Sequence, residues 1–183
     1  TQSVVQPSGG SLGFGVSGDP HSVVIYPTEG DMPQPTQVLT SQHGDDAYID
    51  GFDKDANHEK GSLWLTTNGK RTPLFRFDLS QLPPDAVIKG AQLSVFVNSG
   101  SSAVSMNTSL HALRRYWTVG EVTWKDARAG EEWEVEGAQG ADQDYDPEPC
   151  ARAELHSTNA RYSYNVTGLV RRWLEKPETN YGM

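Results

Sequence analysis

The sequence lacks several features that would place it in a common functional class. Cys150 is the only cysteine among 183 residues, which excludes an internal disulfide, a CxxC redox pair and a cysteine zinc knuckle. No stretch approaches the roughly 20 consecutive apolar residues of a membrane-spanning helix. Basic residues number 15 against 24 acidic ones, and the net charge of -9 repels a phosphate backbone. Membrane insertion and nucleic-acid binding are therefore not expected.

Recognisable catalytic machinery is also missing. The sequence holds neither an HExxH metalloprotease motif nor a P-loop, and its five histidines are widely separated. We therefore predict that the chain is not an enzyme. It starts at Thr1 without a basic and apolar leader, which is typical of a secreted protein after removal of its signal peptide. We expect it outside the cell, on the surface or in a matrix.

Glycine and proline are frequent, with 18 and 11 residues, and they separate many short β-prone segments. Residues 1–26 contain three such segments, the last of which is Ser22, Val23, Val24, Ile25 and Tyr26. Residues 27–44 are rich in proline, glutamine and threonine, and they are predicted to form an extended linker. The sequence therefore predicts an N-terminal strand segment, a linker, and one all-β domain over residues 45–183.

Two stretches of this domain show clear periodicity. Residues 73–79 alternate, with phenylalanines on one face and Arg76 on the other, which predicts a strand with one apolar and one hydrated face. Residues 166–175 carry apolar side chains at helical spacing, with Asn165 as the expected N-cap and Pro177 as the stop. We expect one short amphipathic helix near the C-terminus, packed on a β-sandwich.

The segment from Arg71 to Leu93, RTPLFRFDLSQLPPDAVIKGAQL, resembles the core of the DNRLRE domain family. Other matching segments occur in the family's order: Asp46-Ala-Tyr-Ile, Tyr116-Trp117 followed by Glu121-Val-Thr-Trp, and Asn165-Val-Thr-Gly-Leu-Val-Arg-Arg-Trp. The resemblance implies an extracellular, jelly-roll-like antiparallel β-sandwich. It also implies, as in some members, a carbohydrate-binding module for an acidic polysaccharide.

The end of the sequence departs from this family. Members continue with closing strands where this sequence stops at Met183, and residues 1–26 resemble those strands, so the sequence looks circularly permuted. An unfilled sandwich would expose unpaired strand edges, so we expect residues 1–26 to complete either their own sandwich or a neighbour's. The first prediction is a structural subunit that donates Ser22–Tyr26 to the next copy, giving a head-to-tail homopolymer. The alternative is a secreted module that binds a polysaccharide.

Two acidic clusters are candidate calcium sites, because each places oxygen-bearing side chains at alternate positions, as calcium loops do. Their residues are Asp53, Asp55 and Asn57 in the first cluster, and Asp142, Asp144 and Asp146 in the second. Neither cluster meets the EF-hand pattern. The competing interpretation of both is a solvated acidic turn, and the sequence leaves the two interpretations open.

Arg114 and Arg115 beside Tyr116 form the candidate glycan platform, because a tyrosine ring can stack on the apolar face of a sugar. Residues 131–148 contain eight carboxylates and no lysine or arginine, so they carry most of the net charge of -9. Such a block repels an acidic polysaccharide unless calcium bridges the two. The charge distribution therefore argues against the acidic ligand that the resemblance implies.

Overall fold

The computed structural model describes residues 21–26, 37–83, 86–100 and 105–183. Residues 1–20 and 27–36, which include most of the predicted N-terminal segment and much of the predicted linker, lie outside the described residues. The described part consists mainly of antiparallel strands with one short α-helix near the C-terminus, which confirms the predicted all-β class. None of its helices has the length and apolar character needed to cross a membrane.

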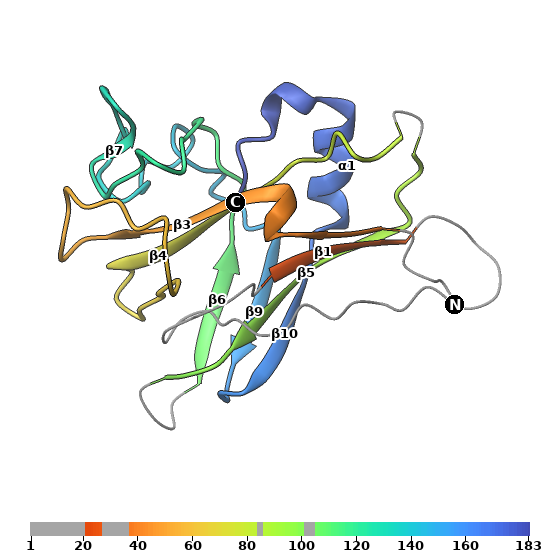
Figure 1. Cartoon of the computed structure of the whole chain (residues 1–183), viewed down its shortest axis with the longest axis horizontal. Helices are drawn as coiled ribbons and strands as arrows, with labels where there is room; N and C mark the ends of the chain where they lie inside the picture. The colour runs from red at the N-terminus through yellow and green to blue at the C-terminus, as the bar shows by residue number, and fades with distance from the viewer. Residues whose placement is uncertain (1–20, 27–36, 84–85, 101–104) are drawn as a thin grey trace.

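The strands, in chain order, are β1 (His21–Tyr26), β2 (Gln37–Thr40), β3 (Gly44–Asp50), β4 (Arg71–Phe77), β5 (Gly90–Val97), β6 (Met106–Leu110), β7 (Asp126–Arg128), β8 (Glu131–Glu132), β9 (Ala151–Leu155) and β10 (Ala160–Asn165). The helix α1 spans Thr167–Glu175, and short 3-10 helices span Ser41–His43 (η1) and Pro177–Thr179 (η2). Figure 1 shows α1 at one side of the molecule and β7 at the other.

The largest sheet has four antiparallel strands in the order β10-β5-β1-β2. Its inner face is apolar because Leu93, Val95 and Val97 alternate along β5 and are buried. On the neighbouring β10, Tyr164 lies opposite Leu93 and is also buried. These side chains form the main core together with residues from β3, β4, β6, β9 and α1, so the architecture is a β-sandwich.

The β3–β4 hairpin is buried on both faces, which differs from the prediction of one hydrated face for residues 73–79. Phe75 belongs to the main core, whereas its neighbour Leu74 belongs to a second core with Ile49 and Trp117. Alternation along β4 therefore separates two apolar environments instead of an apolar one from water. The hairpin forms a shared layer between the two cores.

The helix confirms the predicted amphipathic pattern. Leu169, Val170 and Trp173 are buried against the main core. The helix begins one residue later than expected, with Val166 at the N-cap position. Asn165 still contributes, because its Oδ1 accepts hydrogen bonds from the Thr167 backbone N–H at 3.1 Å and from the Thr167 hydroxyl at 2.7 Å.

The C-terminal residues pair with the outer edge of β4. The backbone N–H of Met183 donates to the Phe75 carbonyl, and the N–H of Phe75 donates to the Met183 carbonyl, both at 2.8 Å. Gly182 has φ +88°, and a Cβ there would lie 2.3 Å from the Phe75 carbonyl oxygen, so glycine is required. The described C-terminus consequently lies in the middle of the molecule (Figure 1).

The predicted donor strand Ser22–Tyr26 is part of β1, and β1 lies inside the four-stranded sheet of the same chain. It pairs with β5 from His21 opposite Val95 to Tyr26 opposite Gly90, and with β2 on its other side. The predicted linker also differs from the structure at its end, because residues 37–44 form β2, η1 and the start of β3. The high content of polar residues in this segment concealed a short strand.

Candidate functional site

Each residue of the predicted platform, Arg114, Arg115 and Tyr116, has partners within the protein. Arg114 Nη2 lies 2.7 Å from Asp146 Oδ1, and Arg172 Nη1 lies 3.0 Å from Asp146 Oδ2. Burial acts to raise the pKa of Asp146, but the hydrogen bonds from the two arginines outweigh it and lower the pKa below its ordinary value. Arg114 therefore stabilises an internal carboxylate.

Arg115 makes a similar internal contact with Asp144. The carboxylate of Asp144 is fully buried and accepts a hydrogen bond from Arg115 Nε at 3.0 Å. It also accepts three backbone hydrogen bonds, from the N–H groups of Glu134, Val135 and Gly140. Four donors saturate the carboxylate, so Asp144 organises the surrounding loops and offers no free oxygen lone pairs to an ion.

Tyr116 is about half exposed, at 42%. Its ring is already packed against two guanidinium groups, with Arg76 Cζ at 4.6 Å and Arg128 Cζ at 5.5 Å from the centroid. The edge of Tyr181 also meets the ring. These contacts leave less of the ring for a sugar than the sequence suggested.

The two predicted metal clusters are also dispersed. Asp55 pairs with Lys125 at 2.6 Å, and the side-chain amide of Asn57 donates to the carbonyls of Val119 and Val122, both at 2.8 Å. In the second cluster Asp142 points outward, with 66% of its side chain exposed, while its two partners are held as described above. Within the described residues, no three His, Cys, Asp or Glu side chains meet in a group suited to a metal ion.

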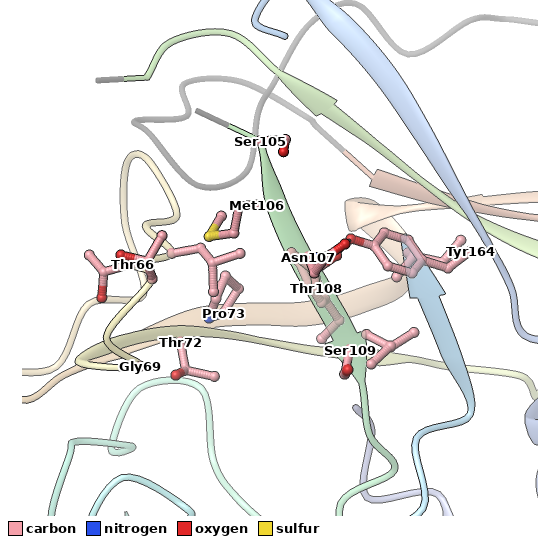
Figure 2. A pocket seen from close by; sticks show the side chains of 15 residues that line it. Thr66, Gly69, Thr72, Pro73, Ser105, Met106, Asn107, Thr108, Ser109 and Tyr164 are labelled. Carbon is pink, nitrogen blue, oxygen red and sulfur yellow. The ribbon is translucent and has the colours of Figure 1, made fainter. Parts of the chain in front are cut away.

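A cavity of about 420 Å³ lies between the start of β4, the preceding loop and strand β6 (Figure 2). Its uncharged polar lining residues are Thr66, Thr67, Thr72, Ser105, Asn107, Thr108, Ser109 and Tyr164. Its apolar walls include Leu65, Pro73 and Met106. None of the 15 lining residues carries a charge. We call this cavity the hydroxyl groove.

Two side chains fix the shape of the hydroxyl groove from within. The Tyr164 hydroxyl lies 2.6 Å from Thr108 Oγ1, as Figure 2 shows, and the Thr108 hydroxyl also contacts the Ala153 carbonyl at 2.8 Å. Burial raises the pKa of Tyr164, so its hydroxyl stays neutral at physiological pH. The side chains of Asn107 and Ser109, which also line the groove, have no hydrogen-bond partner among the described residues. They are available to a ligand.

Sequence reasoning missed the hydroxyl groove because its walls come from four separated parts of the chain. Residues 65–75, Leu93, residues 105–110 and Tyr164 meet only after β4, β5, β6 and β10 have packed. Serine, threonine and asparagine are also common in turns, and no spacing among them marks a site. The neighbouring hydroxyl residues Thr108 and Ser109 on β6 were the one sequence feature that could have indicated this groove.

A second, wider cavity of about 830 Å³ lies beside α1, and its lining is strongly charged. The charged lining residues are Arg114, Arg171, Arg172, Lys176, Asp142, Asp146 and Glu175. Three of its four cations are bonded within the protein, since Arg171 Nε donates to the Ile88 carbonyl at 2.8 Å and the other two hold Asp146. Most cations of this cavity are therefore already held by groups of the protein itself.

The described residues form an all-β sandwich with an uncharged groove between its strands. A family comparison agrees with this class: residues 37–134, more than half of the chain, match the model of carbohydrate-binding module family 96. The chain belongs to carbohydrate-binding module family 96. The matched region includes every lining residue of the groove except Tyr164. No curated protein and no solved structure matches the chain closely enough to add a relative.

This membership supports the predicted polysaccharide partner and agrees with the prediction that the chain is not an enzyme, since carbohydrate-binding modules are binding domains. It supports the alternative function, carbohydrate binding, better than fibre assembly. The DNRLRE family is not the one that the comparison names, so that narrower resemblance stays a prediction.

Proposed function

We propose that the protein binds an uncharged polysaccharide in the hydroxyl groove. The observation that carries this proposal is the lining: eight hydroxyl or amide side chains beside apolar walls, with no charged residue. Sugars present hydroxyl groups around their ring edges and apolar C–H faces, so this lining matches both parts of a sugar ring. Since polysaccharides of this kind lie mainly outside cells, the proposed ligand also favours a secreted protein.

The charge of the molecule supports a neutral ligand. The net charge is -9, and the acidic block over residues 131–148 is only partly compensated, by partners such as Lys54, Arg115 and Arg128. A uronic-acid polymer would be repelled by this field, and no lining residue of the groove is a cation. The charge of Arg71, which is bonded to Thr66 beside the groove, is balanced by the buried Asp50. A neutral glycan has no such cost.

Binding to a polysaccharide panel tests the proposal. Affinity electrophoresis through gels that contain xylan, mannan, soluble β-glucan or polygalacturonate should show retardation by at least one neutral polymer and none by polygalacturonate. The paired change Asn107→Ala and Ser109→Ala removes two free polar groups from the groove and should weaken binding by about tenfold, as expected for two hydrogen bonds. Ser163→Ala, an exposed serine on β10 outside the groove, is the matched control.

Three outcomes would contradict the proposal. These are passage of the wild-type protein through all neutral gels without retardation, binding of polygalacturonate alone, and binding by the paired variant that equals binding by the control. Melting curves should be the same for all three proteins, which ensures that a loss of binding reflects the groove and not the fold.

Self-assembly through β1 is the second candidate function, and one observation favours it. β1 occupies an inner position of the sheet, between β5 and β2, yet it precedes its partners in the chain and is joined to β2 by residues 27–36. The same pairing made between two copies would link subunits head to tail, since domain swapping reuses native contacts. The oligomeric state of the full chain tests this candidate, as argued in the Discussion.

A further inference from the structure

An exposed aromatic side chain lies on the turn after β3. Phe52 is 66% exposed, the most exposed of the large apolar side chains in the described residues. Its position is fixed from below, because the Phe52 backbone N–H donates to Asp50 Oδ1 at 2.8 Å and Asp50 itself is buried. The hydrogen bond to the buried Asp50 thus fixes the backbone of a residue whose phenyl ring is exposed to solvent.

Arg71 lies between Phe52 and a second aromatic residue, Trp64. Its Cζ is 5.5 Å from the Phe52 ring centroid and 5.4 Å from the Trp64 ring centroid. The Nε of Arg71 donates to Asp50 Oδ2 at 2.8 Å. Its two terminal nitrogens have no hydrogen-bond partner among the described residues. Phe52, Arg71 and Trp64 therefore form an aromatic and cationic row with free donors, which we call the aromatic platform.

The aromatic platform adjoins the hydroxyl groove. Arg71 and Thr66 are joined by two hydrogen bonds, from the Thr66 N–H to the Arg71 carbonyl at 3.2 Å and from the Arg71 N–H to Thr66 Oγ1 at 3.0 Å, and Thr66 lines the groove. Arg71 also shares a face of β4 with Pro73, another lining residue, because strand side chains two positions apart point the same way. Figure 2 shows Thr66 and Gly69 on a loop at one side of the groove, away from Tyr164.

We propose that the aromatic platform is a second sugar subsite, and that the ligand is a linear oligosaccharide that occupies the groove and the platform together. One ring lies among the groove hydroxyls, and a later ring of the same chain stacks on Phe52 while Arg71 donates to its hydroxyl groups. This inference rests on the proposed function. It adds that affinity depends on chain length, because a single sugar reaches only one of the two subsites.

Affinity against ligand length is the test. Gluco-, manno- and xylo-oligosaccharides of one to six units are titrated by calorimetry into the wild-type protein and into Phe52→Ala, Phe52→Trp and Val87→Ala. Val87 is 65% exposed and does not line the groove, so its truncation matches that of Phe52. Phe52→Ala should weaken binding of the longest ligand by about tenfold and leave the shortest ligand that binds unchanged. Phe52→Trp should keep the length dependence, and Val87→Ala should have no effect.

The failures of the two proposals are distinguishable. If no oligosaccharide binds the wild-type protein, the proposed function fails and the second subsite with it. If the wild type binds and Phe52→Ala binds equally well at every length, only the second subsite is refuted. An equal loss at all lengths, together with a lower melting temperature, would mean that Phe52 is structural and would also refute it.

Discussion

Asp142, Asp144 and Asp146 stand at alternate positions and have identical side chains, but the structure gives them different surroundings. Asp144 is fully buried and accepts four hydrogen bonds, Asp146 is shared by two arginines, and Asp142 is exposed. The value of a carboxylate to stability depends on its burial and its donors more than on its charge. A sequence pattern that treats the three as equivalent ligands misses this difference.

Asp144→Asn should therefore destabilise the protein strongly. The substitution places an NH₂ group against backbone N–H donors and removes the buried carboxylate that pairs with Arg115, which typically costs about 3 kcal/mol of the free energy of unfolding. Asp142→Asn is the matched control, because Asp142 is exposed and asparagine tolerates its φ of 67°. Urea unfolding of both variants measures the difference. Equal stability of the two would contradict the buried network.

The acid stability of the protein should depend on Asp146. Burial acts to raise the folded-state pKa of Asp146, but Arg114 and Arg172 outweigh it and lower this pKa. The contribution of Asp146 to the free energy of unfolding is therefore complete above the pKa of the unfolded state. It is lost as the pH falls through the lower pKa of the folded state. Asp146→Asn should lower stability by about 1 kcal/mol at neutral pH, a modest value because both arginines are half exposed. Below about pH 4 the difference should shrink.

Melting curves of Asp146→Asn and the wild type between pH 2 and 7 provide the measurement. Glu148→Gln is a suitable control, because Glu148 is 88% exposed and lies 4.0 Å from Arg152. A difference from the wild type that stays constant down to pH 2 would show that Asp146 acts by packing alone and not by its charge.

At the scale of elements, α1 depends on one buried side chain. Trp173 is 2% exposed and packs with Leu169 and Val170 into the main core. Trp173→Ala should cost roughly 3–5 kcal/mol of the free energy of unfolding and yield little folded protein. Trp173→Phe is a second, milder variant. Because the buried indole Nε1 has no hydrogen-bond partner among the described residues, replacing the indole by a phenyl ring removes packing contacts only. It should lower the free energy of unfolding by roughly 1–2 kcal/mol. Thermal unfolding ranks the variants, and an unaffected Trp173→Ala would mean that α1 is misplaced.

An element could be predicted from the sequence where one of its faces is buried and the other is exposed to solvent. The helix has one buried stripe and one hydrated face, so the spacing from Leu169 to Trp173 predicted it to within one residue at its start. β4 has no hydrated face, since Leu74 and Phe75 enter different cores, and alternation misidentified one of its faces. β2 has four residues, too few for a periodic signal.

The candidate site could be predicted less well than the strands and the helix, because its residues are brought together by long-range packing. Arginines next to an acidic block could be ligand donors or internal partners, and only the fold brings Arg115 to the buried Asp144. The groove depends on the meeting of β4, β5, β6 and β10, and the platform depends on the turn that exposes Phe52. Long-range packing decides such sites, and local patterns do not contain it.

At the scale of the whole molecule, β1 decides whether the largest sheet is continuous. It makes six residue pairs with β5 and four with β2, and β2 has no other strand partner in the described residues. Without β1, the edge of β5 is unpaired and Leu39, which is fully buried in the main core, loses the strand that holds it in place. Open strand edges beside an apolar core promote aggregation.

Deletion of residues 1–26 should consequently give a protein that aggregates, and a separate peptide of residues 1–30 should restore a soluble one. The same peptide with Val24→Pro should fail, because proline removes a backbone donor from the strand that pairs with both neighbours. Light scattering after size-exclusion chromatography measures both outcomes. A deletion variant that stays soluble and folded on its own would contradict the structural role of β1.

Light scattering of the full chain decides whether β1 pairs within its own chain or with another copy. Linear polymers that persist on dilution would mean that β1 pairs between copies, whereas a monomer well above micromolar concentration would mean that each chain fills its own sheet, and self-assembly through β1 would then be excluded.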